Sequence, residues 1–203
     1  MAGKKKNGWK HIPAVFLGSF VLAAAVGFGS ELLIRHTFPI LTYILLLLVI
    51  GTGVIFDIVG IAATAASEAP HHARAANRVF GAQQAVYLVR NADKVANFTN
   101  DIVGDIAGIL SGVMVATIIL DIIRTYPSLQ ALEIWLSTGM LALAASLNIT
   151  GKAMGKSFAI REANHIIGMV GGIIASFEKV TGLNFTQLKK RGGRKNGAAR
   201  RDS

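Results

Sequence analysis

The feature that most constrains this chain is an apolar run too long and too uniform for the core of a soluble domain. The stretch LTYILLLLVIGTGVIF begins at Leu41, carries no charged residue and lies within an apolar segment at about 38–66. About 20 apolar residues are enough for a helix to cross the hydrocarbon core of a bilayer. The segment at 38–66 therefore predicts a transmembrane helix that is tilted or emerges from the membrane at its end.

Three further segments have the same character, at about 13–34, 101–123 and 129–150. Charged residues make up only 16% of the chain, whereas about 25% is usual in soluble domains. We therefore expect an all-α, polytopic helical membrane protein, with four transmembrane helices in a single transmembrane domain over 13–182. The first segment follows a basic head and also fits a secretory signal, but its apolar character continues to Ile34, which favours an uncleaved anchor.

Positive residues are distributed unevenly between the two sides of these spans. Nineteen of the 21 lysines and arginines fall in the head, in the 67–100 segment or after Thr150, and only Arg35 and Arg124 fall on the other side. Lysines and arginines near the ends of spans are retained in the cytoplasm. We therefore expect a multi-pass protein of the plasma membrane with both termini cytoplasmic.

Two segments outside the spans have helical periodicity. Apolar residues recur at steps of three and four between Ala75 and Val89, and again between Ile166 and Val180. These patterns predict cytoplasmic juxtamembrane amphipathic helices at about 71–98 and 160–181. Such helices lie along the inner membrane face, or pack on each other and on a partner subunit.

The two ends of the chain are basic. The head at 1–12 and the tail at 183–203 hold lysines and arginines without a pattern of apolar residues, so the tail is expected to be disordered. Both ends are expected to bind anionic lipid at the bilayer surface. The final stretch KKRGGRKNGAARRDS has no aromatic residue on which a base could stack, so a nucleic-acid partner is not expected.

Acidic residues that stand within apolar spans are the candidates for function. A carboxylate near the bilayer centre costs about 2.5 to 3.5 kcal/mol, so it usually faces a cavity, a cation or a basic partner. Asp57 and Asp105 stand deepest in their spans, and each is either a cation ligand or half of an ion pair with Lys152 or Lys156. Glu68 is either a further ligand or the inner-surface partner of Arg74 or a lysine. The spacing places Asp57, Ser67 and Glu68 on one helical stripe with Gly53, Gly60 and Thr64.

Glycines recur every fourth residue in the third span, at Gly104, Gly108 and Gly112. This spacing lets another helix backbone approach closely, and it predicts helix packing or a homodimer contact there. The chain has no cysteine, and its five histidines have no spacing typical of zinc sites. No nucleophile, base and orienting group stand together in the pattern, so we do not expect an enzyme.

Four motifs in order resemble the transmembrane domain of the CorC, CorB and cyclin-M magnesium-transporter family, also known as domain of unknown function 21. They are AATAASEAP, GAQQAVYLVRNADKVANF, NDIVGDIAGI and ITGKAMGKSFAI. Ser67 and Glu68 match the family's serine-glutamate-alanine segment, Asn91 falls in its cytoplasmic helix, Gly104 matches its glycine-asparagine helix start, and Lys156 matches its glycine-glutamate-x-x-proline-lysine motif. The similarity extends from about Leu41 to Lys179.

Departures from the family pattern alter the site that the resemblance implies. Asp105 stands where the family has asparagine, and Lys152 stands where it has the glutamate of its last motif. A charge exchange accounts for both, with Asp105 supplying the carboxylate that Lys152 displaced. Such a pair either holds a purely structural core or opens to accept an ion. We also expect this protein to lack the paired nucleotide-binding regulatory domains that many members carry.

The resemblance implies a divalent-cation transporter or ion-handling membrane protein that uses Mg²⁺ or a similar cation as its ligand and needs no organic cofactor. The expected metal ligands are oxygens of Asp57, Ser67, Glu68 and Asp105, because Mg²⁺ prefers oxygen ligands. The expected partners are the lipid bilayer, a second copy of the chain and a separate regulatory subunit. The alternative is a membrane assembly or regulatory subunit in which Asp105 and Lys152 only hold the fold.

Overall fold

The computed structural model describes residues 39–182, together with the isolated helical positions 13, 16, 17, 20, 21, 24 and 28. The basic head at 1–12, the basic tail at 183–203 and nearly all of the expected first span at 13–34 lie outside the described residues. The described part of the chain is helical throughout, with short turns and no strand, which confirms the all-α prediction for that part.

Three helical stretches are long and apolar enough to cross a membrane among the described residues. They are Ile40–Ala65, Ala92–Thr125 and Pro127–Arg161. These three stretches contain the expected spans at 38–66, 101–123 and 129–150, apart from the ends of the first. Many of their large apolar side chains are exposed, including Ile134 and Trp135 at 77% each. Exposed apolar surface of this extent is expected where lipid, rather than water, surrounds a helix.

Contacts divide the chain into two compact units, each built from two separate stretches of sequence. The first unit comprises Met1–Phe56 and Asn100–Ala153, and the second comprises Asp57–Thr99 and Met154–Ser203. Helix α2 (Pro39–Ala65) belongs to the first unit up to Phe56 and to the second from Asp57, and helix α7 (Glu133–Arg161) changes unit after Ala153.

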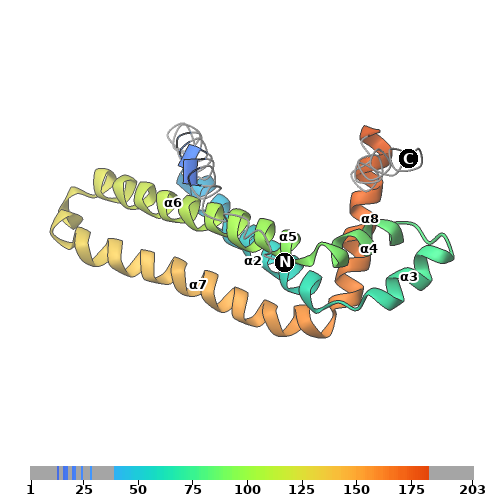
Figure 1. Ribbon diagram of the computed structural model, residues 1–203. Coiled ribbons are helices and arrows are strands. Elements are labelled where there is room, and N and C mark those ends of the chain that lie inside the picture. Colours follow the sequence, from blue (N-terminus) through green and yellow to red (C-terminus); the bar gives the residue numbers. More distant parts are fainter. Residues whose placement is uncertain are drawn as a thin grey trace, which may run out of the picture. The chain divides into compact units, whose positions relative to one another are not determined.

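The first unit packs part of α2 against α6 (Gly104–Thr125) and part of α7. Its buried core consists of side chains from all three helices: Leu46, Ile50, Met114, Val115, Ile118, Ile119 and Ala144. Helices α6 and α7 run in opposite directions, joined by the 3₁₀ helix η3 (Pro127–Leu132), as Figure 1 shows. Pro127 begins η3, where the missing proline N–H costs no hydrogen bond.

Close helix approach in the first unit occurs at two glycines outside the expected set of three. A Cβ on Gly53 would lie 2.9 Å from the Ala107 Cβ, and a Cβ on Gly151 would lie 2.8 Å from a Val54 methyl. By contrast, a Cβ on Gly108 or Gly112 would meet nothing within 4 Å. Within this chain, therefore, α2 approaches α6 and α7 through Gly53 and Gly151, while Gly108 and Gly112 border open space.

The second unit contains the short helices α3 (Glu68–Ala76), α4 (Ala82–Arg90) and α5 (Ala92–Ala96), and the long helix α8 (Ala163–Thr181). A π-helical stretch, η2 (Asn97–Val103), leads from α5 towards α6. The expected helix at 160–181 corresponds to α8, preceded by the end of α7. The expected single helix at 71–98 is divided instead, because Arg78 and Gly81 adopt positive φ angles of 55° and 77° between α3 and α4.

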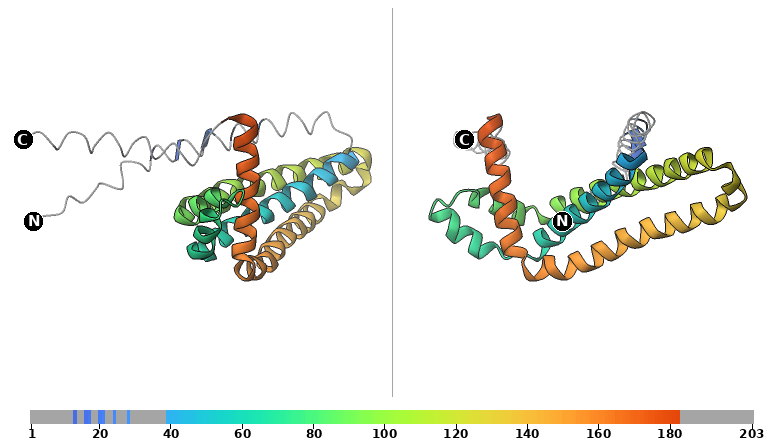
Figure 2. Two further views of the ribbon diagram at one scale, coloured as in Figure 1. Left: turned by 90° about the vertical axis from the view of Figure 1, so that its right-hand side faces the viewer. Right: turned by 180° about the vertical axis from the view of Figure 1, so that it is seen from behind.

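Helix α8 crosses the start of α4 at very short range, and Figure 2 shows the two helices beside each other. A Cβ on Gly171 would lie 2.5 Å from the Gly81 carbonyl oxygen and 2.9 Å from the Ala85 backbone nitrogen. Only glycine fits at Gly171, and Gly81 also needs its left-handed backbone conformation. The core beneath this crossing is made largely of small side chains: Ala62, Ala63, Ala85, Leu88, Ala159, Ala163, Ile166 and Ile167.

Candidate functional site

Asp57 is a half-buried carboxylate in the apolar helix α2. It stands eight residues before the end of α2 at Ala65, or about 12 Å along the axis. Among the described residues it has neither a hydrogen bond nor an ion pair. An unpaired carboxylate in a membrane-spanning helix is costly, so its position calls for a ligand, a proton or water.

Ser67 and Glu68 lie together where α2 gives way to α3. The Ser67 backbone N–H donates a 2.9 Å hydrogen bond to Asn164 Oδ1, next to the start of α8. The Ser67 side chain does not cap α3, whose first turn holds Glu68. The stripe expected from the sequence therefore ends in a turn that is tied to α8.

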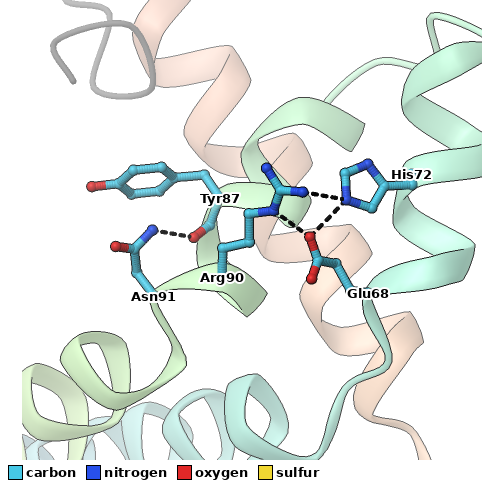
Figure 3. A network of polar contacts seen from close by, with 5 residues as sticks. All are labelled: Glu68, His72, Tyr87, Arg90 and Asn91. Carbon is cyan, nitrogen blue, oxygen red and sulfur yellow. Dashed lines mark hydrogen bonds and ion pairs between the residues drawn. The ribbon is translucent and has the colours of Figure 1, made fainter. Parts of the chain in front are cut away.

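The Glu68 carboxylate is held by two basic side chains, which we call the Glu68 network (Figure 3). Its Oε1 accepts a hydrogen bond from Arg90 Nε and lies 2.6 Å from His72 Nε2. Arg90 Nη2 is also 3.1 Å from His72 Nε2. A single ring nitrogen cannot donate to Glu68 while accepting from Arg90, so only one of these two histidine contacts is a hydrogen bond at a time.

The same network keeps Glu68 ionised. The hydrogen bond to His72 lowers the pKa of Glu68 from its usual value, and the Arg90 guanidinium lowers it further, against a smaller opposing effect of burial. The partner expected from the sequence was Arg74 or a lysine, whereas the structure brings Arg90 from α4. The side chains are 40% exposed for Glu68 and 60% for Arg90, so this is a surface network.

Asp105 and Lys152 do not form the ion pair that charge exchange would produce. Asp105 is exposed in the first turn of α6, Lys152 is half-buried in α7, and no ion pair joins them within the part of the chain that the structure describes. Of the three glycines predicted for packing, Gly104 is buried, Gly112 is half-buried and Gly108 is exposed. Over residues 39–182 and the isolated positions before them, no three His, Asp or Glu side chains are grouped to hold a metal ion.

Two polar side chains that the sequence analysis did not select have buried atoms without partners. They are Thr42 in α2, whose Oγ1 has no hydrogen-bond partner among the described residues, and Asn148 in α7, whose Oδ1 has none either. Both stand in candidate membrane spans. Their only signal in the sequence is polarity within an apolar run. Several other threonines and serines in the same stretches share that signal, but their hydroxyls bond to their own helix backbone, as those of Ser111 and Thr117 do.

His71 is a deeply buried ionisable residue that the sequence analysis did not select. It is 1% exposed, and neither ring nitrogen has a hydrogen-bond partner among the described residues. Burial lowers the pKa of His71, as does the Arg74 guanidinium. The Asn164 side chain lies close enough to the ring to oppose this shift, but it does not meet the geometry of a hydrogen bond to either ring nitrogen. The paired histidines after Pro70 are thus separated by the helix, with His71 facing inward and His72 facing the Glu68 network.

A scan against protein-family models and searches of characterised proteins and of solved structures found no match to this chain.

Proposed function

We propose that this protein handles divalent cations of the magnesium type within the membrane and that the Asp57 carboxylate is a cation ligand. The observation that carries the proposal is a half-buried carboxylate, without a basic partner among the described residues, in a helix long and apolar enough to span a bilayer. The resemblance of the sequence to the CorC and cyclin-M transmembrane domain points to the same class of ligand.

The chemistry of Mg²⁺ suits a site with few protein ligands. Mg²⁺ keeps several of its waters and commonly binds through one or two carboxylates, so it does not need three clustered acidic side chains. Glu68 is the least suitable of the expected ligands, because a cation would have to displace Arg90 and His72 from its carboxylate. The proposal therefore relies on Asp57 and assigns Glu68 to the Glu68 network.

Thermal unfolding of the purified protein in detergent, with titration of Mg²⁺, Mn²⁺ and Co²⁺, tests this function. A ligand at 100 times its dissociation constant stabilises the folded state by about 2.7 kcal/mol. Asp57→Asn keeps the shape and one oxygen, so the apo protein should unfold as the wild type does while the cation-dependent stabilisation falls. Asp93→Asn is the matched control, because Asp93 is exposed at the start of α5. Equal stabilisation of the wild type and Asp57→Asn would contradict the proposal.

A second function, as a membrane assembly or regulatory subunit, is favoured by the open glycine surface of α6. A Cβ added at Gly108 or Gly112 would meet nothing within 4 Å, so another helix has room to pack there. We propose that a second copy of the chain occupies this surface. Gly108→Leu should leave thermal unfolding of the isolated subunit unchanged but reduce the oligomer measured by light scattering in detergent, whereas Gly139→Leu, at another open glycine, should not.

If Gly108→Leu kept the wild-type oligomeric size, the glycine surface would not be the contact between copies. The cation titration distinguishes the two functions, because an assembly subunit predicts no stabilisation by any of the three cations.

A further inference from the structure

A small cavity in the second unit is lined by both buried and exposed basic side chains. It has a volume of about 180 Å³ and lies between α3, the turn that leads into α4, and α8. Its polar lining consists of His71 and Arg74 from α3 and His165 from α8. The remainder is Gly168 and the apolar residues Val79, Phe80, Ala82, Ala85 and Met169, so no acidic residue lines it. We call it the His71 pocket.

His71 gives this pocket an unsatisfied donor. A buried polar group without a hydrogen bond costs about 1 to 3 kcal/mol, so native structures rarely keep one without a reason. The His71 ring is 1% exposed, and its two nitrogens have no partner among the described residues. Burial lowers the pKa of His71 and so favours the neutral ring, in which one nitrogen carries a hydrogen to donate.

Arg74 supplies a charge that no carboxylate neutralises among the described residues. The acidic residue expected to pair with it, Glu68, is bound by Arg90 and His72 instead. The Arg74 guanidinium packs over Gly168, where a Cβ would lie 3.1 Å from Nη1, so the glycine leaves room for it at the pocket wall. A guanidinium in this position can offer two parallel N–H groups to an oxyanion.

We propose that the His71 pocket binds a phosphate group, either on a lipid headgroup or on a soluble phosphate compound. The donors come from three positions on two helices, which suits a tetrahedral oxyanion with several acceptor oxygens better than a planar carboxylate that a single arginine can saturate. The arginine disfavours a metal ion at the two histidines, because it places a fixed positive charge beside them. Pockets that hold larger ligands have volumes of about 300 Å³ or more. The His71 pocket is smaller than that, so it suits a headgroup rather than a whole cofactor.

Calorimetric titration of the full-length protein in detergent tests the proposal with two probes. Inorganic phosphate is titrated against chloride at constant ionic strength, and micelles containing phosphatidic acid are compared with micelles containing phosphatidylcholine. Binding of both probes, or of either one, supports the pocket: phosphate alone indicates a soluble ligand, and phosphatidic acid alone indicates a lipid. Binding of neither probe overturns the proposal.

Substitutions then test whether the phosphate group binds at this pocket. Arg74→Gln should weaken binding about tenfold or more, because a hydrogen bond to a charged group contributes about 1.5 to 3 kcal/mol. Arg161→Gln removes the same charge at an exposed position in the same unit and should bind as the wild type does. Equal binding by Arg74→Gln and the wild type would mean adventitious contact elsewhere and would overturn the proposal.

His71→Leu separates a binding role from a structural one. Because the buried ring nitrogens have no partner among the described residues, an apolar residue of similar size should leave the unfolding temperature of the ligand-free protein unchanged or raise it, while phosphate binding weakens. A lower unfolding temperature with unchanged binding would show that His71 is structural, and the assignment of the pocket would fail. Light scattering confirms in each case that the variant keeps the wild-type oligomeric size.

Discussion

Glu68 illustrates how neighbours decide the chemistry of a single residue. By sequence it was a candidate metal ligand at the end of a polar stripe, yet in the structure it stands in the first turn of α3, where the helix dipole favours a carboxylate. Arg90, which lies 22 residues further on, reaches the same oxygen as His72. With its Oε1 contacted by His72 of α3 and Arg90 of α4, Glu68 acts as a link between the two helices.

This link predicts a pH dependence of stability. The pKa of Glu68 in the folded protein lies below the unfolded value of 4.5, because His72 and Arg90 favour the carboxylate. The contribution of Glu68 is therefore present above pH 4.5 and is lost as the pH falls through the folded-state pKa. We expect the difference in unfolding temperature between the wild type and Glu68→Gln to be largest above that pH and to shrink below it.

The control for the pH experiment is Asp93→Asn, since Asp93 is an exposed carboxylate whose side chain has no ion pair or hydrogen bond among the described residues. Its difference from the wild type should stay small throughout the titration. A Glu68→Gln difference that did not change with pH would contradict the assignment of the network.

At the scale of elements, the crossing of α4 and α8 depends on backbone contact. Gly81 and Gly171 bring the two chains so close that a single added methyl group would meet main-chain atoms at 2.5 Å. Main-chain atoms cannot rotate away as a long side chain can, so the helices themselves would have to separate. The crossing also forms one boundary of the second unit's alanine-rich core, which contains few large side chains that could adjust.

Adjacent glycines on α8 provide a matched test of this crossing. Gly171→Ala should destabilise the protein by about 1 to 3 kcal/mol, the usual cost of overpacking, whereas Gly172→Ala should be neutral or slightly stabilising. The reason is that a Cβ at Gly172 meets nothing within 4 Å. Denaturant or thermal unfolding measured by circular dichroism reports both values. Similar changes in stability for the two variants would contradict the crossing, because the contact at Gly171 would then not limit how closely α4 and α8 approach.

At the scale of the whole molecule, the distribution of charge predicts the orientation in the membrane. The proposed arrangement places the head, the 67–100 segment and the region after Thr150 in the cytoplasm, because they hold nineteen of the 21 lysines and arginines. The turn at Tyr126 and Pro127 then faces the outside. This orientation is independent of whether the protein handles cations or serves as an assembly subunit.

Reporter fusions test the orientation directly. A phosphatase that is active only after export should be inactive when joined at Lys6 or after Asp202, and active when inserted beside Ser128 in the turn between α6 and α7. A reporter that is active only in the cytoplasm should give the reverse pattern. Export activity at either terminus would contradict the proposed topology.

Helical character and the approximate bounds of three apolar helices could be predicted from the sequence alone. Each depends on local properties: an uncharged run such as that from Leu41 to Phe56 satisfies its own backbone hydrogen bonds as a helix, whatever its neighbours are. The same local reasoning identified Asp57 as an unusual carboxylate. It also predicted α8, because its apolar residues repeat at helical spacing.

Tertiary structure alone decided which residues meet. The periodicity predicted one helix over 71–98. The positive φ angles at Arg78 and Gly81 divide this segment into α3 and α4 and let α4 pack against α8. Glycine spacing pointed to Gly108, whereas close approach within the chain occurs at Gly53, Gly151 and Gly171. His71 and His72 look equivalent in sequence, yet one is buried beside Arg74 and the other joins Glu68. These outcomes depend on contacts between residues far apart in the chain, and a local pattern carries no information about its distant partner.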